Sequence, residues 1–215
     1  MIERLACKLG RNDEIPNIEL AEYICRYDDA AGILEIVEGF KGEDKAVAND
    51  CIKVLYEIGE RKPELICDYA SDFISRLDSK NNRLVWGSMT ALAKIATLNP
   101  QPIFEKLESV ISAYECGSTI TVDNSISVFA GLCKANGDYA EKVLPIIITH
   151  LQKCRPKEVA QHAERASICF NKENAKSFVE VLETRKSDLV TSQQTRVNKL
   201  LKKLALFLSA TACKG

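Results

Sequence analysis

Four amphipathic segments of this 215-residue chain end alike: VLYEIG at 54–59, KIATLN at 94–99, GLCKAN at 131–136 and SICFN at 167–171. Each segment closes on Gly or Asn, the residues that most readily adopt the left-handed conformation just past the C-terminus of a helix. The closing residues are Gly59, Asn99, Asn136 and Asn171, so the intervals between them are 40, 37 and 35 residues. A repeat of this length that holds two helices is typical of an α-solenoid.

Apolar residues upstream of each closing residue recur with helical spacing. Ala91, Leu92, Ile95 and Leu98 follow Ser88 at the offsets that place side chains on one face of a helix. A second helix is expected between successive closing residues, at 63–77, 101–115, 138–154 and 172–186. We therefore predict an all-α fold, a right-handed α-solenoid of about five helical hairpins.

The hairpins are expected to form a single domain over residues 1–215. Its repeat units fall approximately at 17–42 (a partial unit), 43–82, 83–122, 123–156 and 157–209, with a flexible tail at 210–215. The last helix, at 192–209, carries Arg196, Lys199, Lys202 and Lys203 beside a row of apolar residues. One charged face and one buried face are what an end repeat requires, because no further unit covers its outer side.

The composition is that of a folded globular protein, with 46% hydrophobic and 27% charged residues. Nine cysteines are scattered along the chain, the nearest pair being Cys154 and Cys169, which indicates reduced thiols in a cytosolic protein. The sequence has neither a signal peptide nor a stretch of the roughly 20 apolar residues that a membrane span needs. We expect a cytoplasmic protein that does not associate with membranes.

Charge is distributed unevenly although the net charge is only −1. Residues 1–110 contain 14 Lys and Arg against 20 Asp and Glu, whereas residues 111–215 contain 15 against 10. Such an asymmetry can orient a partner or favour head-to-tail contacts between copies. The nearly neutral total removes the strongest argument for general nucleic-acid binding.

The repeat units resemble HEAT repeats of the armadillo-type superfamily. In that superfamily the first helix often contains an internal proline, and VLPIIITHL at 143–151 is similar. The second helix of the family typically starts with a Val-Arg pair whose arginine forms a ladder between units, but the matching positions hold Val85-Trp86 and Val122-Asp123. The resemblance covers about residues 17–208; it implies the architecture and indicates no particular subfamily or activity.

The candidate site follows from this architecture, in which the second helix of each unit lines the concave face. Trp86 is the only tryptophan and takes the place of the ladder arginine beside Arg83. Its ring either anchors a partner or packs between neighbouring units. The other polar residues expected to face the groove are Asn49, Asp50, Lys53, Thr90, Asp123, Asn124 and Ser127.

This mixture of residues is more typical of a peptide-binding surface than of a phosphate track, which needs repeated Lys and Arg. We predict a non-enzymatic interaction scaffold or adapter that binds a peptide or protein segment on the concave face. The alternative is a DNA-binding or DNA-alkylation-repair-like HEAT-repeat protein, in which Trp86 with Asp50, Arg83 or Asp123 would hold DNA. Basic residues at Lys153, Arg155, Lys157 and on the last helix are candidates for contact with a nucleic-acid backbone or an acidic protein, although a solvated face is the ordinary role of such residues.

No metal or cofactor is expected from the sequence. His150 and Cys154 are one helical turn apart and Cys169 follows, but structural zinc sites usually supply ligands in closely spaced pairs. These residues come singly from different predicted helices. His162-Ala163-Glu164 resembles the His-x-Glu of zinc deaminases, yet the companion Pro-Cys-x-x-Cys is missing. No phosphate-binding loop or nucleophile motif is found either.

Overall fold

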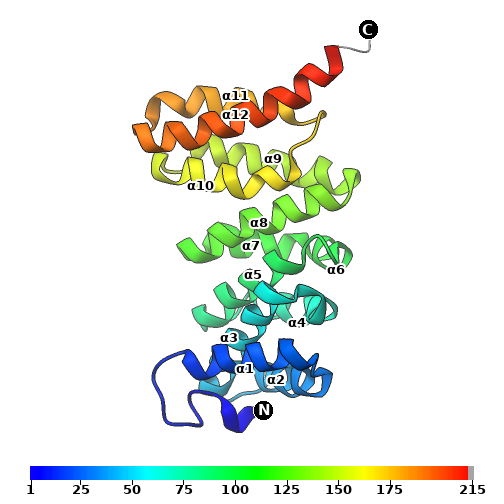
Figure 1. Ribbon diagram of the computed structural model, residues 1–215, viewed down its shortest axis with the longest axis vertical. Helices are drawn as coiled ribbons and strands as arrows, with labels where there is room; N and C mark the ends of the chain where they lie inside the picture. The colour runs from blue at the N-terminus through cyan, green and yellow to red at the C-terminus, as the bar shows by residue number, and fades with distance from the viewer. Residues whose placement is uncertain (213–215) are drawn as a thin grey trace. The chain divides into compact units, whose positions relative to one another are not determined.

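The computed structural model describes the main chain of residues 1–212 and the side chains of residues 1–209. Over this part of the chain the protein is all-α, built from α-helices and short 3-10 turns without a strand, as predicted (Figure 1). Its contacts divide it into two compact units, residues 1–128 and 129–215. The boundary lies within the helix α8 (Thr119–Ala135).

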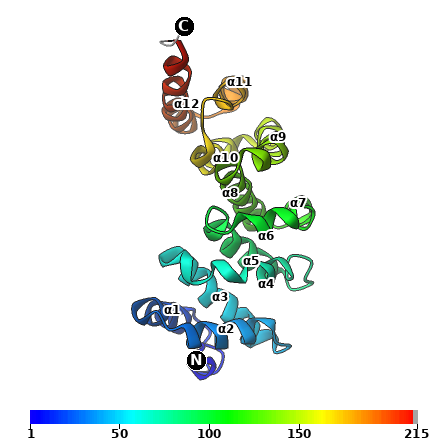
Figure 2. The same ribbon diagram turned by 90° about the vertical axis from the view of Figure 1, so that its right-hand side faces the viewer.

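The first unit is organised around one central helix. Besides the start of α8, it contains α1 (Ile15–Tyr27), α2 (Ala30–Lys41), α3 (Lys45–Arg61), α4 (Ala70–Ile74), α5 (Asn82–Ile95), α6 (Pro100–Glu105) and α7 (Leu107–Cys116). The helix α3 packs against α1, α2 and α5, and both views show it between α1 and α5 (Figures 1 and 2). Its residues Ile52 and Leu55 are fully buried, and the rings of Phe40 and Phe73 lie 5.8 Å apart in the same core.

The second unit contains the end of α8 together with α9 (Gly137–Lys153), α10 (Pro156–Ala166), α11 (Ala175–Arg185) and α12 (Thr191–Ala212). The helix α12 packs against α10 and α11, and α9 packs against α11. Phe178 and Leu204 have no exposed surface, and the ring of Phe178 lies 4.5 Å from that of Phe170. The unit therefore has an apolar core of its own.

The residues predicted to close the helices have a different role in the structure. Gly59 is buried inside α3, which continues to Arg61, and Asn136 is the N-cap of α9, where its Oδ1 accepts the Asp138 N–H at 2.8 Å. Asn99 precedes α6 with φ −134°. Among described residues, only Asp28 and Gly10 have positive φ. The prediction of a left-handed closing residue at 59, 99, 136 and 171 was therefore wrong. At Asn136 the reason is that an Asn side chain suits the start of the next helix equally well.

Two of the predicted helices are interrupted. The segment 63–77 forms 3-10 turns at Pro63–Leu65 and Cys67–Tyr69 before α4, and the segment 101–115 is divided into α6 and α7 at Lys106. Ile66 (φ −121°, ψ 0°) and Lys106 (φ −113°, ψ 29°) depart from helical geometry at the breaks. The apolar residues keep their helical spacing across both breaks, so the sequence pattern alone did not reveal where the helices are interrupted.

The main chain is helical to Ala212, and 213–215 lie outside the described residues, so the flexible tail at 210–215 stays a prediction. All eight cysteines that the structure describes are free. No helix within the described residues has both the length and the apolar character needed to cross a membrane.

Candidate protein-interaction surface

Polar and aromatic side chains of three helices gather in the first unit, and we call this surface the α3–α5–α8 face. It consists of Asn49, Lys53, Tyr56 and Glu57 on α3, of Arg83, Trp86 and Thr90 on α5, and of Asn124 on α8. On α3 these positions follow one another by 4, 3 and 1 residues and so lie on one side of the helix. The other side of α3, which includes Ala48, Cys51, Ile52 and Leu55, is buried in the core.

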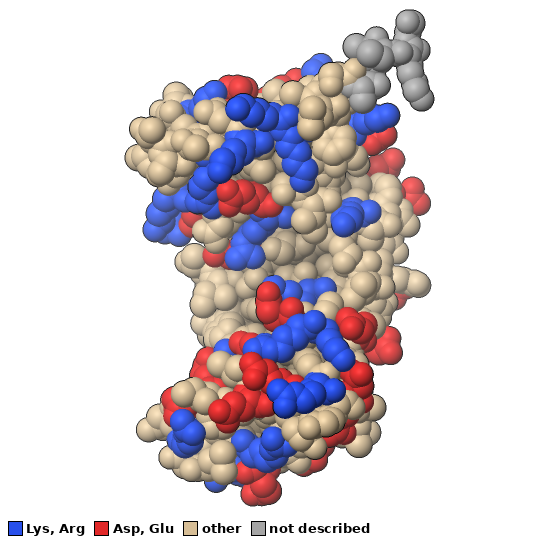
Figure 3. Space-filling view, viewed as in Figure 1, with Lys and Arg blue, Asp and Glu red and all other residues tan. Residues whose placement is uncertain are grey.

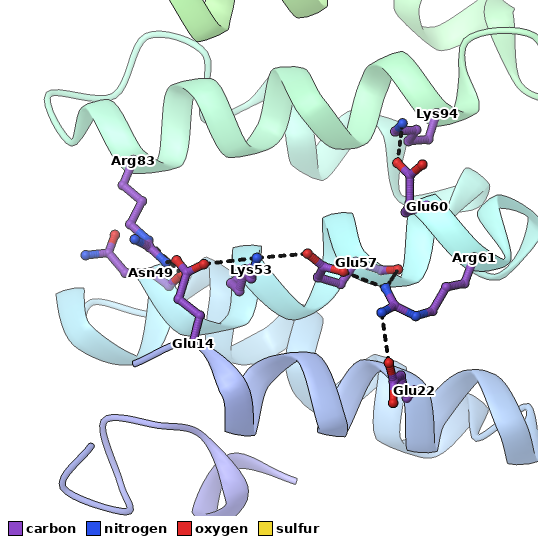
Figure 4. Close-up of polar contacts among 9 residues, drawn as sticks. All are labelled: Glu14, Glu22, Asn49, Lys53, Glu57, Glu60, Arg61, Arg83 and Lys94. Carbon is purple, nitrogen blue, oxygen red and sulfur yellow. Dashed lines mark hydrogen bonds and ion pairs between the residues drawn. The ribbon is translucent and has the colours of Figure 1, made fainter. Parts of the chain in front are cut away.

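A chain of opposite charges ties the α3 part of this face to α1 and α5 (Figure 4). Glu14, the N-cap residue of α1, accepts from Arg83 Nη2 at 2.5 Å and from Lys53 Nζ at 3.0 Å. Lys53 also pairs with Glu57 at 2.8 Å, and Glu57 pairs with Arg61 at 2.5 Å. Arg61 then reaches Glu22 of α1 at 3.1 Å. Six charges of alternating sign therefore connect the helices α1, α3 and α5.

Lys53 lies at the centre of this chain and is only 7% exposed. Burial by itself would lower its pKa, but hydrogen bonds to Glu57 and Glu14 outweigh this effect and hold the pKa above its ordinary value. Burial would raise the pKa of Glu57 and of Glu14, yet their cationic partners keep both pKa values below the ordinary value. All three groups are therefore charged at neutral pH.

Trp86 lies half-buried at the middle of the face. Its ring packs against the Tyr56 ring at 5.7 Å with an interplanar angle of 47°, and the Arg83 guanidinium lies 5.6 Å from the Trp86 ring centroid. No side chain that the structure describes accepts a hydrogen bond from the indole N–H, which is not among the buried polar atoms. One side of Trp86 therefore packs on Tyr56, and the role of its ring as an anchor for a partner stays a prediction.

Amide and hydroxyl groups continue the face on either side of Trp86. Asn81 Nδ2 donates to Asn49 Oδ1 at 2.7 Å, and Asn124 Nδ2 donates to Thr90 Oγ1 at 2.9 Å. The Thr90 hydroxyl donates to the main-chain oxygen of Trp86 at 2.7 Å. These bonds orient the amides between helices and leave polar groups beside an aromatic surface.

Six of the nine predicted site residues are brought together in this way: Asn49, Lys53, Arg83, Trp86, Thr90 and Asn124. Asp123 and Ser127 lie half-buried on α8. Asp50 does not belong to the group, since its carboxylate accepts the Cys7 N–H at 2.8 Å. This bond fixes the N-terminal segment to α3. Burial and a hydrogen bond to Asp50 also raise the pKa of the Cys7 thiol to about 11.

Sequence reasoning missed two residues of the α3–α5–α8 face, Tyr56 and Glu57, and also Glu14, the carboxylate of α1 that pairs with Lys53 and Arg83 of this face. Tyr56 and Glu57 follow Asn49 and Lys53 at helical spacing, so the period that identified the buried stripe of α3 could have found them on the opposite stripe. Glu14 is 69 residues from Arg83 in the sequence. No local pattern predicts that contact, because only the packing of α1 against α3 produces it.

A second cluster, in the second unit, has the residue types of a metal site. His150 near the end of α9, Cys154 just after α9 and His162 on α10 place one ligand atom each within 4.8 Å of one another. The sequence analysis considered His150 and Cys154 together with Cys169 and set them aside for lack of closely spaced ligand pairs, and it did not connect His162 with them. The packing of α9 against α10 brings them together.

Comparisons with known proteins identify the fold alone. No known protein family matches the sequence, and no curated protein matches it. Among solved structures, a designed armadillo repeat protein in complex with the peptide (KR)4 is similar with a TM-score of 0.70 at 15% identity, over 87% of this chain and 90% of that chain.

Two further solved structures have a similar fold. A computationally designed armadillo repeat protein for modular peptide recognition has a TM-score of 0.67 at 15% identity, over 87% of this chain and 91% of its own. An engineered protein has a TM-score of 0.67 at 16% identity, over 95% of this chain and 96% of its own. The chain therefore has the helical repeat fold of armadillo and HEAT-like proteins, without a particular subfamily.

Proposed function

We propose that this protein is a non-enzymatic scaffold that binds an extended peptide or protein segment across the α3–α5–α8 face. The observation that carries the proposal is the half-buried Trp86, packed against the tilted Tyr56 ring, whose indole N–H has no acceptor among the described residues. Similar folds support the choice of ligand, because one of the similar designed armadillo repeat proteins is in complex with a peptide and another was designed for modular peptide recognition.

The physical properties of the face suit a peptide. An aromatic ring that is already held by a neighbouring ring loses little conformational freedom when a ligand covers it, and tryptophan is enriched among residues that dominate binding energy. Amide groups at Asn49 and Asn124 flank the ring on neighbouring helices. Asn124 is buried and its amide nitrogen donates to Thr90 and to the Ile120 main chain, so the half-buried Asn49 amide is the one that main-chain groups of an extended segment would meet.

The cations of this face do not favour the alternative of a nucleic acid. Lys53 is nearly buried between two carboxylates, and Arg83 is paired with Glu14. Figure 3 shows acidic and basic side chains interleaved over the visible side of the first unit. A phosphate backbone needs a row of cations with little competition from carboxylates.

Basic side chains do gather elsewhere, over α10 and α12 of the second unit (Figure 3). Arg196 on α12 pairs with Glu164, and Arg155 pairs with Glu158. This cluster lies outside the α3–α5–α8 face. Binding of duplex DNA that weakens steeply with salt would point to it and to the alternative function.

Intrinsic fluorescence provides a direct test, since Trp86 is the only tryptophan. The wild-type chain should capture a defined set of proteins from a native extract, and peptides scanned from those proteins should change the Trp86 emission in a saturable manner. The peptide (KR)4 and a length-matched acidic peptide are defined first probes. Calorimetric titration, which needs no tryptophan, should show that Trp86→Ala weakens binding of the selected peptide about 30-fold, the loss typical of a central aromatic anchor.

Tyr27→Ala is the matched control, because Tyr27 is an exposed aromatic residue at the end of α1. It should leave binding unchanged, and circular dichroism should show that both variants fold. Trp86→Phe retains a ring against Tyr56 and loses the N–H, so it provides a second variant if Trp86→Ala unfolds. Equal capture of the same partners by a folded Trp86 variant and the wild type would refute the proposed face.

A further inference from the structure

The cluster of His150, Cys154 and His162 offers a chemistry that the α3–α5–α8 face does not use. His150 Nε2 lies 2.7 Å from His162 Nδ1, and their rings are tilted by 50° with centroids 4.7 Å apart. His162 is fully buried and His150 is 8% exposed. Two imidazoles and a thiol that meet in a largely buried position form a donor set of nitrogen and sulfur.

This donor set selects a particular class of metal ion. Imidazole and thiolate suit zinc and related borderline ions, whereas calcium and magnesium require oxygen ligands. In a tetrahedral zinc site with Zn–N of about 2.0–2.1 Å and Zn–S of about 2.3 Å, two nitrogens lie about 3.3 Å apart and nitrogen and sulfur about 3.6 Å apart. To accommodate the ion, the two nitrogens would move apart by about 0.6 Å, and the sulfur, which lies within 4.8 Å of the nitrogens, would approach them by at most about 1.2 Å.

The surrounding residues hold the cluster in place. Arg185 of α11 donates from Nη1 to the main-chain oxygens of Leu151 and Gln152 at 2.6 and 2.9 Å, and from Nη2 to that of Cys154 at 2.9 Å. These bonds fix the end of α9, where Cys154 lies. His162 is fixed by its position in the middle of α10, which packs against α9 and α12.

We propose that His150 Nε2, Cys154 Sγ and His162 Nδ1 bind a zinc ion that joins the end of α9 to α10. Glu158, one turn before His162, is bonded to Arg155 Nε at 2.8 Å. The fourth ligand is therefore a water molecule rather than this carboxylate. The ion replaces the short contact between the two imidazoles with two metal bonds and adds the thiolate as a third.

Cobalt(II) substitution tests the site, since tetrahedral cobalt–thiolate coordination has a near-ultraviolet charge-transfer band and intense visible bands. The full chain is purified with a chelator, kept reduced and titrated with Co2+, then with Zn2+ as competitor. We expect one equivalent to produce both signals and Zn2+ to remove them. X-ray absorption of the zinc form should show one sulfur neighbour at about 2.3 Å and three nitrogen or oxygen neighbours at about 2.0–2.1 Å.

Variants separate this cluster from the other cysteines. Cys154→Ser should abolish the charge-transfer band, and His162→Gln should weaken Co2+ binding at least tenfold, whereas Cys116→Ser, at an exposed position on α7, should retain both. Circular dichroism checks the fold, and the X-ray measurement on the wild type needs no variant. Absence of the cobalt signals, or signals that persist unchanged in a folded Cys154→Ser protein, would overturn the proposal.

Discussion

Lys53 is the residue on which the charges of the first unit converge. A cation that is nearly buried between two carboxylates offsets their mutual repulsion, and its removal leaves both acids facing each other without compensation. Glu14 is 42% exposed, so solvent screens part of this cost. The residue is therefore more important for stability than an ordinary surface lysine.

Replacing Lys53 with Met should lower the free energy of unfolding by roughly 2 kcal/mol, less than for a fully buried pair because Glu14 is partly exposed. Urea titrations at pH 7 measure this change. The exposed Lys176, which pairs loosely with Glu180 at 3.9 Å, offers the control Lys176→Met, which should change stability by less than about 0.5 kcal/mol. Equal effects of the two substitutions would contradict the central role of Lys53.

The same charges predict the pH dependence of stability. The pKa values of Glu14 and Glu57 are lower in the folded protein than the ordinary value of 4.5, so the unfolded chain takes up their protons first as pH falls. The contribution of these two ionised carboxylates to the free energy of unfolding is complete above about pH 4.5 and is lost as pH falls through their pKa values in the folded protein. Stability measured between pH 7 and pH 3 should decrease at the acidic end, and less steeply in Lys53→Met. Parallel curves for the two proteins would count against this assignment.

At the scale of helices, the close approach of α3 and α5 depends on one glycine. A Cβ at Gly87 would lie 2.6 Å from Ile52 Cγ1, inside the core. Gly87→Ala should therefore destabilise the protein by about 1–2 kcal/mol, although alanine is the better helix former. Gly137 on α9 has nothing within 4 Å of the same position, so Gly137→Ala should be neutral or stabilising. Thermal unfolding of both variants distinguishes the effect of helix packing from that of helix propensity. A Gly87→Ala protein more stable than the Gly137→Ala protein would show that α3 and α5 separate easily.

Substitutions of Asn136, at the start of α9, test whether it acts as an N-cap. As an N-cap, Asn136 accepts from the Asp138 N–H, so Asn136→Asp should be tolerated while Asn136→Ala costs about 1 kcal/mol. A left-handed closing residue would instead make Asn136→Gly the best replacement and Asn136→Asp a poor one. Chemical denaturation of the three variants therefore decides between the observed role and the role expected from the sequence.

At the scale of the whole molecule, the contacts form two compact units whose boundary lies within α8. Repeat proteins are stabilised mainly by contacts between neighbouring elements, so a defect in one place need not spread far. Lys53→Met should lower amide protection in α1, α3 and α5 and leave α10 to α12 nearly unchanged. Hydrogen exchange read by mass spectrometry measures this, and a uniform loss of protection along the chain would show that the two units unfold as one.

The sequence by itself determined the helical repeat class, because buried stripes with helical spacing and recurring boundaries at intervals of 35–40 residues are local patterns. It also singled out six residues of the α3–α5–α8 face, since these lie on helices whose buried side was already known. The breaks at Ile66 and Lys106 were not foreseen, because apolar periodicity continues across them.

Only the tertiary structure decided which residues from distant parts of the chain meet. The contact of Glu14 with Lys53 and Arg83 depends on how α1, α3 and α5 pack, and the meeting of His150 with His162 depends on α9 lying against α10. A helical period tells which side of a helix is buried. It does not tell which other helix covers that side, because many apolar surfaces are equally compatible with it.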